Sequence, residues 1–396
     1  MSSSTPSSRP ELDRRLGMAG ALAIGLASML GTGVFAAWTP AMNLAGPYVL
    51  VSLLIAGIVA SLNAWSTAAL ARVHPVAGGA YAYGRIRLGR IPGNVAGIAF
   101  VIGKVASAGA AALTIGTYLA PAHASVIALV SVALMVSLDL RGVSRTAMVC
   151  AISATVVLVV LVLLVSWTVI AGASVVGQAV SPDSPGPLGV LAASGILFVA
   201  FAGYARVATM GEEVRDPART LPRAIAISIT IVFLTYVAVG SVVLRVIGPL
   251  EVRETAPLRQ LAAIVAGPVM VDTVRGAAVV AAGGALLSLL AGVGRTLFAM
   301  AREGDAPSGL MQVSAAGVPQ RAQIVAALGA GIIVLFGGIG AALAVSGASI
   351  LTYYSIAHLA AMRLGADEPH PPRFVPVLGL AGCAVIAVAI VLAARF

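Results

Sequence analysis

A glycine–threonine–glycine step interrupts the first long apolar run of this sequence. In SMLGTGVFAAW, residues 28–38, Gly31 and Gly33 flank Thr32 at the depth where a membrane-spanning helix would be farthest from water. In lipid, unwound backbone is tolerated only where it lines a cavity or is buried in protein. The N–H groups freed by such a break can hold an anionic group, and the freed carbonyls can hold a cation. The chemistry indicated is therefore the binding of a small charged solute.

A second interruption falls in the sixth apolar span. In LFVAFAGYARVATMGEE, residues 197–213, Ala202 and Gly203 break the run. Matched breaks in spans one and six are what two inverted repeats of five helices require. Small residues also mediate ordinary packing between membrane helices, which is the alternative explanation for either stretch taken alone. The matched positions favour a binding site between two repeats.

Lys104, the single lysine of the chain, is the most unusual ionisable residue. It follows Pro92 in the third span by about 18 Å of helix, which places it near the centre of a hydrocarbon layer about 30 Å thick. Its side chain cannot reach water from that depth, and a buried amine readily loses its proton. Three roles are open: proton exchange or a fixed cation replacing sodium, a lysine satisfied by carbonyls, and contact with an acidic substrate side chain.

Other functional classes lack the residues that they need. We find no Asp or Glu in the middle of a predicted span, which argues against a carboxylate relay and against an acid-based membrane enzyme. GKVAS at 103–107 resembles the end of a phosphate-binding loop, but Ile98 stands where its first glycine must be. Cys150 and Cys383 lie in apolar spans without metal-type spacing. We therefore expect no enzymatic centre, no metal and no cofactor.

Composition indicates that membrane helices position these residues. Sixty per cent of the residues are hydrophobic, ten per cent are charged and the mean hydropathy is +1.04. Such values are typical of a polytopic membrane protein. A spanning helix needs about 20 mostly apolar residues. The sequence predicts eleven, near 16–39, 47–71, 92–119, 123–139, 147–173, 187–212, 221–247, 274–301, 321–339, 342–362 and 373–395.

The charge distribution predicts the orientation in the membrane. Residues 1–15, MSSSTPSSRPELDRR, are polar and lead us to expect a disordered cytoplasmic tail. Basic residues concentrate in cytoplasmic loops; with the N-terminus inside, eighteen arginines fall on inner segments and five on outer ones. The same distribution explains the net charge of +10 by topology, so nucleic acid is not an expected partner.

Four ordered stretches resemble the amino acid–polyamine–organocation (APC) superfamily, the amino-acid permeases. GTGVF at 31–35 is similar to the glycine-rich motif of its first helix, and PVAGGAYAYGRIRLG at 75–89 to the signature between its second and third helices. FVAFAGYARVATMGEEVRDPARTLPRAI at 198–225 resembles its sixth helix and following loop, and GRTLFAMAREGDAP at 294–307 the end of its eighth. The resemblance covers about residues 16–363.

The expected fold is all-α, with about eleven transmembrane helices and a five-plus-five inverted repeat of the LeuT type. Residues 16–175 would form the first repeat, 186–363 the second, and 372–396 an eleventh span. In the permeases that this chain resembles, N–H groups of the broken first helix bind the substrate carboxylate. Here these would be the N–H groups of Thr32 and Gly33, with Gly31 allowing close approach. Carbonyls near Met29 and from Phe198 to Phe201 would hold the ammonium.

The same resemblance implies roles for residues around the second break. Phe201 would be the gate over the substrate, and Ala202 and Gly203 would form the hinge. The alternative for Phe198 and Phe201 is lipid or core packing. Arg206 would either close an inner gate or anchor the span at the interface.

This chain departs from the family pattern at two positions, and the first departure, the place of its lysine, puts proton coupling in doubt. Many sodium-independent members carry their lysine in the fifth span, and this chain carries Lys104 in the third. Where members often have an Asp after the sixth-helix aromatic, this chain has Ala205. For His358 we expect a hydrogen-bonded packing role.

The sequence thus predicts a permease for amino acids in the cytoplasmic membrane, sodium-independent, with proton coupling open. Small or apolar amino acids are the expected substrates, because a cationic side chain would find no buried acid. The alternatives are an amino-acid exporter or exchanger and a non-transporting membrane sensor of the same fold. The oligomeric state is left open.

Overall fold

The computed structural model describes residues 16–74, 78–141, 147–173, 186–208, 214–248, 256–314 and 317–394; the expected tail, 1–15, lies outside them. Within these ranges the chain is helical, and the one β pairing is an isolated bridge between Leu16 and Val214. The helices are α1 (Met18–Met29), α2 (Thr32–Ala36), α3 (Trp38–Ala45), η1 (Gly46–Tyr48), α4 (Val49–Val73), α5 (Ala80–Leu88), α6 (Arg90–Leu119), η2 (Pro121–His123), α7 (Ala124–Leu140), α8 (Ala147–Ile170), α9 (Pro187–Phe201), α10 (Tyr204–Ala208), α11 (Pro217–Val246), α12 (Pro257–Val265), α13 (Pro268–Arg302), η3 (Ser308–Met311), α14 (Gln320–Phe336), α15 (Ile339–Ala361) and α16 (Phe374–Ala393).

Ten helical segments in the described part of the chain are long and apolar enough to cross a membrane. They correspond to ten of the eleven predicted spans. The other prediction, 321–339, falls on α14, which has 17 residues and is the one shorter apolar helix found among the described residues. The protein is therefore an all-helical, multi-pass membrane protein with about ten membrane-spanning helices.

The first span continues farther than its predicted end at residue 39. The Ala37 N–H binds the Gly33 carbonyl at 3.0 Å, and the Ala41 N–H binds the Ala37 carbonyl at 3.1 Å. These bonds carry the helical path from α2 into α3, which ends at Ala45. The bend at Ala37, between α2 and α3, therefore interrupts the helix only briefly.

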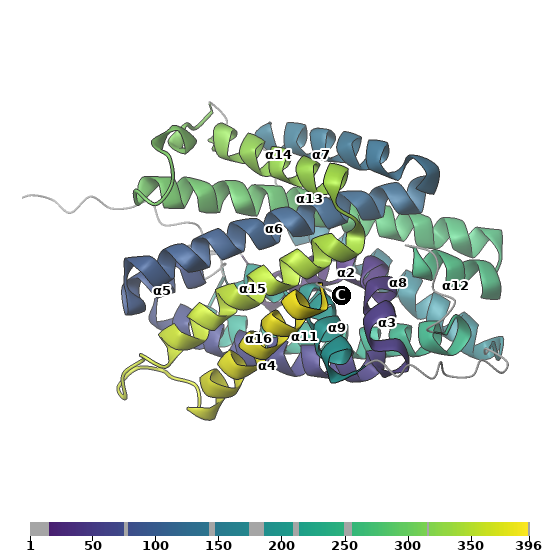
Figure 1. Cartoon of the computed structure of the whole chain (residues 1–396), viewed down its shortest axis with the longest axis horizontal. Helices are drawn as coiled ribbons and strands as arrows, with labels where there is room; N and C mark the ends of the chain where they lie inside the picture. The colour runs from purple at the N-terminus through teal and green to yellow at the C-terminus, as the bar shows by residue number, and fades with distance from the viewer. Residues whose placement is uncertain are drawn as a thin grey trace, which may run out of the picture.

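Helix α6 is the central element of the bundle and packs against α13 and α15 (Figure 1). Small residues on α6 allow this close approach. A Cβ atom added to Gly103 would lie 2.8 Å from the Ile350 side chain of α15, and one added to Gly109 would collide with Ile333 of α14. Because lipid offers no hydrophobic drive for helix association, such close packing stabilises the bundle instead.

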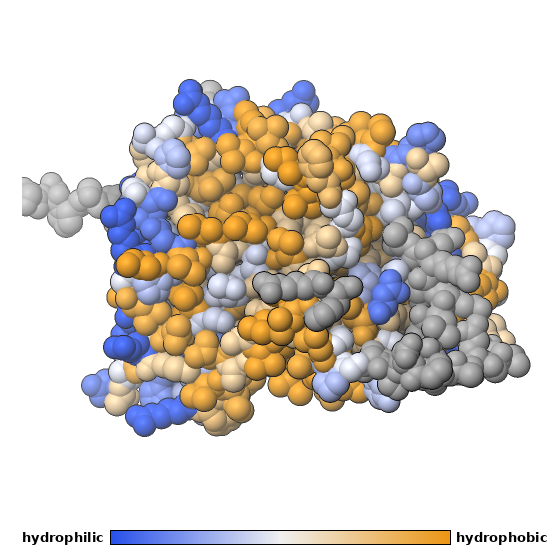
Figure 2. All heavy atoms as spheres, in the orientation of Figure 1, coloured by the Kyte–Doolittle hydropathy of each residue, from blue (hydrophilic) through white to orange (hydrophobic). Residues whose placement is uncertain are grey.

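The outer surface is apolar along the sides of the bundle. Figure 2 shows hydrophobic residues across the middle of one face and hydrophilic residues gathered toward its ends. Large exposed hydrophobic side chains include Ile58 and Trp65 of α4 and Ile98 and Ile102 of α6. Helices α5 and α12 lie at opposite ends (Figure 1). An apolar belt between polar ends is the surface that a bilayer requires.

Candidate functional site

Both predicted interruptions are breaks in the helices. Helix α1 ends at Met29 and α2 begins at Thr32, so Leu30 and Gly31 lie between two half-helices. Neither end carries a side-chain cap, and the first N–H groups of a helix have no acceptor within the helix itself. The break therefore frees backbone groups inside the bundle, as the glycines of this stretch predict.

The second break has the same form. Helix α9 ends at Phe201 and α10 begins at Tyr204, with Ala202 and Gly203 between them. The Ala202 N–H lies 3.2 Å from the carbonyls of both Phe198 and Val199, and the Arg206 N–H binds the Gly203 carbonyl at 3.0 Å. Of the carbonyls expected to hold an ammonium group, those of Phe198 and Val199 thus already share one donor. A carbonyl oxygen has a second lone pair for another donor.

The two breaks pack directly against each other. A Cβ atom on Gly33 would collide with Ala200 of α9, and one on Gly203 would collide with the backbone of Ser28 at the end of α1. Gly31 faces another helix, α13, and a Cβ atom added to Gly31 would lie 3.1 Å from the Cβ atom of Ala285. Glycine is needed at positions 33 and 203 because the backbones of separate helices touch there. The structure brings the predicted residues of both stretches to one place.

Tyr236 of α11 is a site residue that sequence reasoning missed. Its hydroxyl donates a hydrogen bond of 2.6 Å to the carbonyl of Met29 and lies 3.4 Å from that of Ala200. One side chain therefore contacts the free carbonyl ends of both broken helices. The available signal was a tyrosine within an apolar span, since a phenolic hydroxyl buried there must find a partner.

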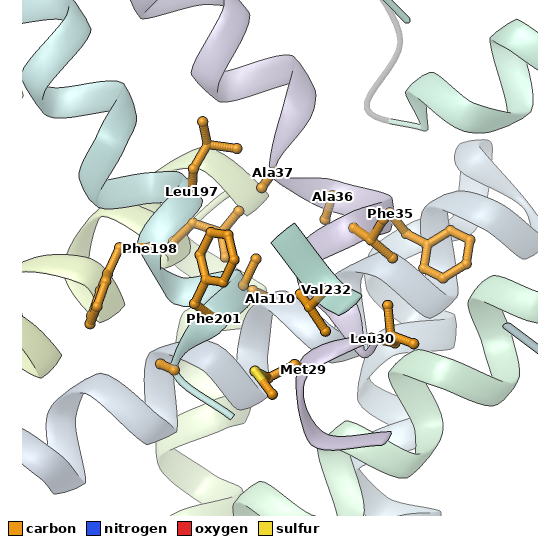
Figure 3. Packing of buried hydrophobic residues seen from close by; sticks show 14 of the residues in the cluster. Met29, Leu30, Phe35, Ala36, Ala37, Ala110, Leu197, Phe198, Phe201 and Val232 are labelled. Atoms are coloured by element: carbon orange, nitrogen blue, oxygen red, sulfur yellow. The ribbon is translucent and has the colours of Figure 1, made fainter. Parts of the chain in front are cut away.

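The two predicted phenylalanines are fully buried, so neither packs against lipid. The Phe201 ring lies 5.3 Å from that of Tyr236 and 6.4 Å from that of Phe233, between centroids. The Phe198 ring packs edge to face against Tyr354 at 6.0 Å. The two rings point to different sides of α9 (Figure 3). Only Phe201 thus lies beside the Tyr236 bridge.

Thr32 carries a polar atom without a partner at the first break. Its Oγ1 is buried and forms no hydrogen bond with any residue that the structure describes. A buried hydroxyl left unpaired is unfavourable. The side chain is therefore free to bind a polar group beside α2.

Lys104 lies at the midpoint of α6 and is half-buried. Its Nζ is 5.8 Å from the centroid of the Phe100 ring, a cation–π distance. It forms no hydrogen bond or ion pair with the other described residues. Ala110, in the packed cluster around Met29 and Phe201 (Figure 3), is about 9 Å farther along α6. Lys104 thus lies on a helix that packs against α2, outside the contact between the breaks.

The remaining predicted residues lie farther out. Arg206 is an exposed residue of α10, three positions after Gly203. His358 is fully buried and hydrogen-bonded to Ser66 at 3.0 Å and to Asn63 at 2.6 Å, as its predicted packing role requires. Across the described ranges, no three His, Cys, Asp or Glu side chains are grouped to hold a metal ion.

An ion-pair cluster lies at the end of the bundle that carries α5. The Asp305 carboxylate accepts hydrogen bonds from Arg85, from Arg90 at 2.9 Å and from the Tyr81 hydroxyl at 2.9 Å. Burial acts to raise the pKa of Asp305, but the hydrogen bonds from Arg90, Tyr81, Asn94 and Arg85 outweigh it and lower the pKa below its usual range. Burial and the bond to Asp305 raise the pKa of Tyr81 to about 12. We call this set the Asp305 cluster; it joins α5 to the end of α13.

A bundle of membrane-spanning helices with two broken helices in mutual contact is an architecture typical of helical membrane transporters. The chain belongs to the amino acid permease family, whose sequence profile matches residues 16–396. This confirms the resemblance and places the chain among transporters, not enzymes.

Individual relatives support the same membership. Uncharacterized transporters of Mycobacterium tuberculosis and Mycobacterium bovis are 42% identical over 96% of this chain and 87% of their own length. The branched-chain amino acid permease BcaP of Bacillus subtilis is 25% identical over 78% of this chain and 71% of its own. Cationic amino acid transporter 7 of Arabidopsis thaliana is 28% identical over 54% of this chain and 42% of its own.

Proposed function

We propose that this chain is a secondary active transporter that carries amino acids across the cytoplasmic membrane by alternating access, with its N-terminus in the cytoplasm. The observation that carries the proposal is the contact between the two breaks, Gly33 on Ala200 and Gly203 on Ser28. Because half-helix ends from two spans meet there, donors and acceptors for a zwitterion are available in one place. The permease family supplies the substrate class.

In this proposal the N–H groups of Thr32 and Gly33 bind the substrate carboxylate, and Gly31 allows the backbone to approach it. The ammonium binds the carbonyl of Met29, on the lone pair that Tyr236 leaves free, and carbonyls between Phe198 and Phe201. The Thr32 hydroxyl, which lacks a partner, adds a further polar contact.

Gating follows from the same geometry. Phe201 would open the site by leaving its contacts with Tyr236 and Phe233, while Ala202 and Gly203 act as the hinge. Arg206 would close the inner side of α10. These movements would open one site alternately to the two sides of the membrane. Residues 16–175 and 186–363 would be the two inverted repeats, and α14 and α16 would bring the number of spans to eleven.

The proposed substrates are small or apolar amino acids. Among the described spans, acidic side chains occur at Asp139 of α7 and Asp272 of α13, near the ends of those helices and on neither broken span. A cationic side chain would therefore lack a buried counter-charge at the breaks. The name of the branched-chain amino acid permease of Bacillus subtilis is consistent with apolar substrates. The name of the Arabidopsis cationic amino acid transporter is consistent with the competing class, cationic amino acids.

Lys104 is proposed to replace a sodium ion, either as a fixed cation or by exchanging a proton during the cycle. Its ammonium has a ring contact with Phe100 and no salt bridge to another described residue, so it is free to lose its proton. A fixed cation would serve transport without any proton gradient. The two roles differ in their response to that gradient.

The test is solute counterflow in proteoliposomes, with each common amino acid in turn, with and without sodium and a proton gradient. Wild type should exchange a few neutral amino acids and ignore sodium. Lys104→Met should lose the gradient dependence or all transport, and the matched variant Lys104→Arg, which keeps a permanent charge, should retain exchange only if a fixed cation suffices.

Counterflow also separates the alternative functions. An exporter or exchanger would give counterflow but no net uptake driven by a gradient. A non-transporting sensor would bind amino acids, detected as a thermal shift of the purified protein, and give no counterflow. Silence in both assays across the panel would contradict the amino-acid assignment.

A further inference from the structure

A buried polar cluster lies where α4, α15 and α16 meet, outside the proposed amino-acid site. His358 binds Ser66 through Nδ1 at 3.0 Å and Asn63 Oδ1 through Nε2 at 2.6 Å. The Cys383 thiol donates to the same Asn63 oxygen at 3.2 Å. All four side chains are fully buried, and we call them the His358 cluster. The His358 ring lies over Gly379, where no Cβ atom would fit.

The cluster fixes the orientation of the Asn63 side chain. Its oxygen accepts bonds from the Nε2–H of a neutral His358 and from the Cys383 thiol, while Nδ1 accepts from the Ser66 hydroxyl. The Asn63 amide nitrogen must then face away from His358, and it has no partner among the described residues. If the amide were turned over, its oxygen would be the unpaired atom instead. Either orientation leaves one polar atom of Asn63 unsatisfied.

Two more buried polar atoms without a hydrogen-bond partner lie on α4 and α10. Thr67 Oγ1 is buried without a partner, one helical turn after Asn63 and on the same face of α4. The Tyr204 hydroxyl of α10 is also buried; the Tyr354 hydroxyl is a polar neighbour, but the pair lacks the geometry of a full hydrogen bond. Tyr204 stacks on Tyr354 at 5.4 Å between centroids, and both tyrosines are within electrostatic range of Cys383. Helices α4 and α10 are in contact, and Cys383 lies near both Asn63 and Tyr204, so the three atoms belong to one region of the bundle.

We propose that this site binds ordered water, which bridges Asn63 and Thr67 of α4 to Tyr204 of α10. Buried water molecules typically have two to four polar partners, and it is polar groups left unpaired by the protein that hold them. Water can both donate and accept, so it satisfies Asn63 in either amide orientation. Nothing with a formal negative charge faces the site from the His358 cluster, Thr67, Tyr204 or Tyr354, which disfavours a metal cation.

The proposed water has a mechanical consequence for the second break. Tyr204 is the first residue of the half-helix that follows the hinge. A water bridge can be remade at slightly different distances, whereas a direct side-chain bond would hold α10 in one position. The site would therefore let α10 shift against α4 without leaving polar groups unpaired in the membrane.

Hydroxyl-radical footprinting of the purified full-length protein tests the site. Short X-ray pulses generate radicals from bound water, so buried side chains beside ordered water are oxidised and dry ones are spared. The two cysteines form a matched pair, because Cys383 and Cys150 are both buried and only Cys383 borders the site. We expect oxidation of Cys383 to exceed that of Cys150 several-fold, and oxidation of Tyr204 to accompany it.

Removal of the water ligands provides the second arm. Thr67→Val and Tyr204→Phe should each lower Cys383 oxidation while thermal unfolding stays cooperative. Equal oxidation of Cys383 and Cys150, or no change in either folded variant, would overturn the proposal. If neither variant folds, a high-resolution wild-type map decides: density within hydrogen-bond distance of all three atoms supports it, and empty space overturns it. If that density disappears when chloride is replaced by gluconate, the site binds an anion and the proposal of bound water is overturned. Neither arm depends on transport.

Discussion

The Tyr236 hydroxyl provides a hydrogen bond to a carbonyl that an unbroken helix would have satisfied itself. Met29 lies at the end of α1, where the next turn is missing, and Tyr236 is the donor that replaces it. Since the same hydroxyl lies beside the Ala200 carbonyl, it also links the first break to the second. A residue of α11 thereby holds the geometry of a site built on other helices.

We expect Tyr236→Phe to destabilise the protein by about 1 kcal/mol, because a buried carbonyl loses its donor, and to weaken substrate binding. Thermal unfolding and the concentration dependence of counterflow measure the two effects. Tyr353→Phe is the control, since the Tyr353 hydroxyl accepts a bond from the Ala80 N–H, away from the breaks. Equal loss of apparent affinity in both variants would show that Tyr236 has no special role.

Gly33 provides the sharpest test of the contact between the breaks. Gly33→Ala would place a methyl group onto Ala200, so we expect loss of counterflow together with lower thermal stability. Gly276→Ala in α13 is the control, because nothing lies within 4 Å of its added Cβ atom. It should stabilise the helix by up to about 1 kcal/mol. A fully active Gly33→Ala variant would contradict the proposed close packing.

At the scale of elements, α5 depends on its ion pairs. It has nine residues, and a helix this short is marginal without tertiary contacts. The Asp305 cluster joins it to the end of α13, while Arg87 binds Glu368 and the Nε2 atom of His74, the latter at 2.7 Å. A neutral imidazole is required for that last bond, because a protonated ring has no acceptor.

This bond predicts a pH dependence of α5. Burial, followed by the charge of Arg87, lowers the pKa of His74. The stabilisation it contributes is therefore complete above the unfolded pKa of about 6.5 and is lost as the pH falls through the lower folded value. The hydrogen bond from Arg87 lowers the pKa of Glu368, and the pKa of Asp305 is lowered as well, so both remain ionised in mild acid.

Hydrogen exchange of residues 80–88, corrected for the intrinsic rate, checks this prediction. Exchange in wild type should be faster at pH 5 than at pH 7.5. His74→Gln should show little pH dependence, since an amide oxygen accepts the bond from Arg87 at both pH values. The same pH response in both proteins would assign the effect to another group.

The breaks could be predicted from the sequence, whereas the elements that support them could not. Glycines in an apolar span give a local signal, so the helix interruptions at Gly31 and Gly203 were predicted. Tyr236 was missed because its partner carbonyls lie on other helices, and which residues meet is decided by packing. Helix α5 was recognised only as part of a motif, because its stability comes from distant residues such as Asp305 and Glu368 and not from periodicity.

For the whole molecule, the sequence predicted membrane spans well because hydropathy over about 20 residues is a strong signal. The predicted eleven spans and the ten long helical segments of the structure differ at α14, which with 17 residues is shorter than those segments. If α14 crosses the membrane together with the ten longer segments, eleven crossings put the C-terminus opposite the N-terminus.

Reporter fusions check that topology. With the N-terminus in the cytoplasm, alkaline phosphatase fused after Phe396 should be active and a fluorescent protein at the same point should be dark. Fusion after Arg363, on the loop before α16, is the matched control and should give the reverse result. Identical behaviour of both fusions would mean that α16 does not cross the membrane.

The length of α14 has a consequence for the surrounding bilayer. A helix of 17 residues is about 26 Å long, several ångströms less than a typical hydrocarbon thickness of about 30 Å. Lipids beside it must compress or the helix ends must be pulled inward, at a free-energy cost that grows with lipid chain length. Phe336, 85% exposed at the end of α14, lies where that compression would be greatest. Turnover should therefore depend on acyl-chain length and be fastest in thin membranes.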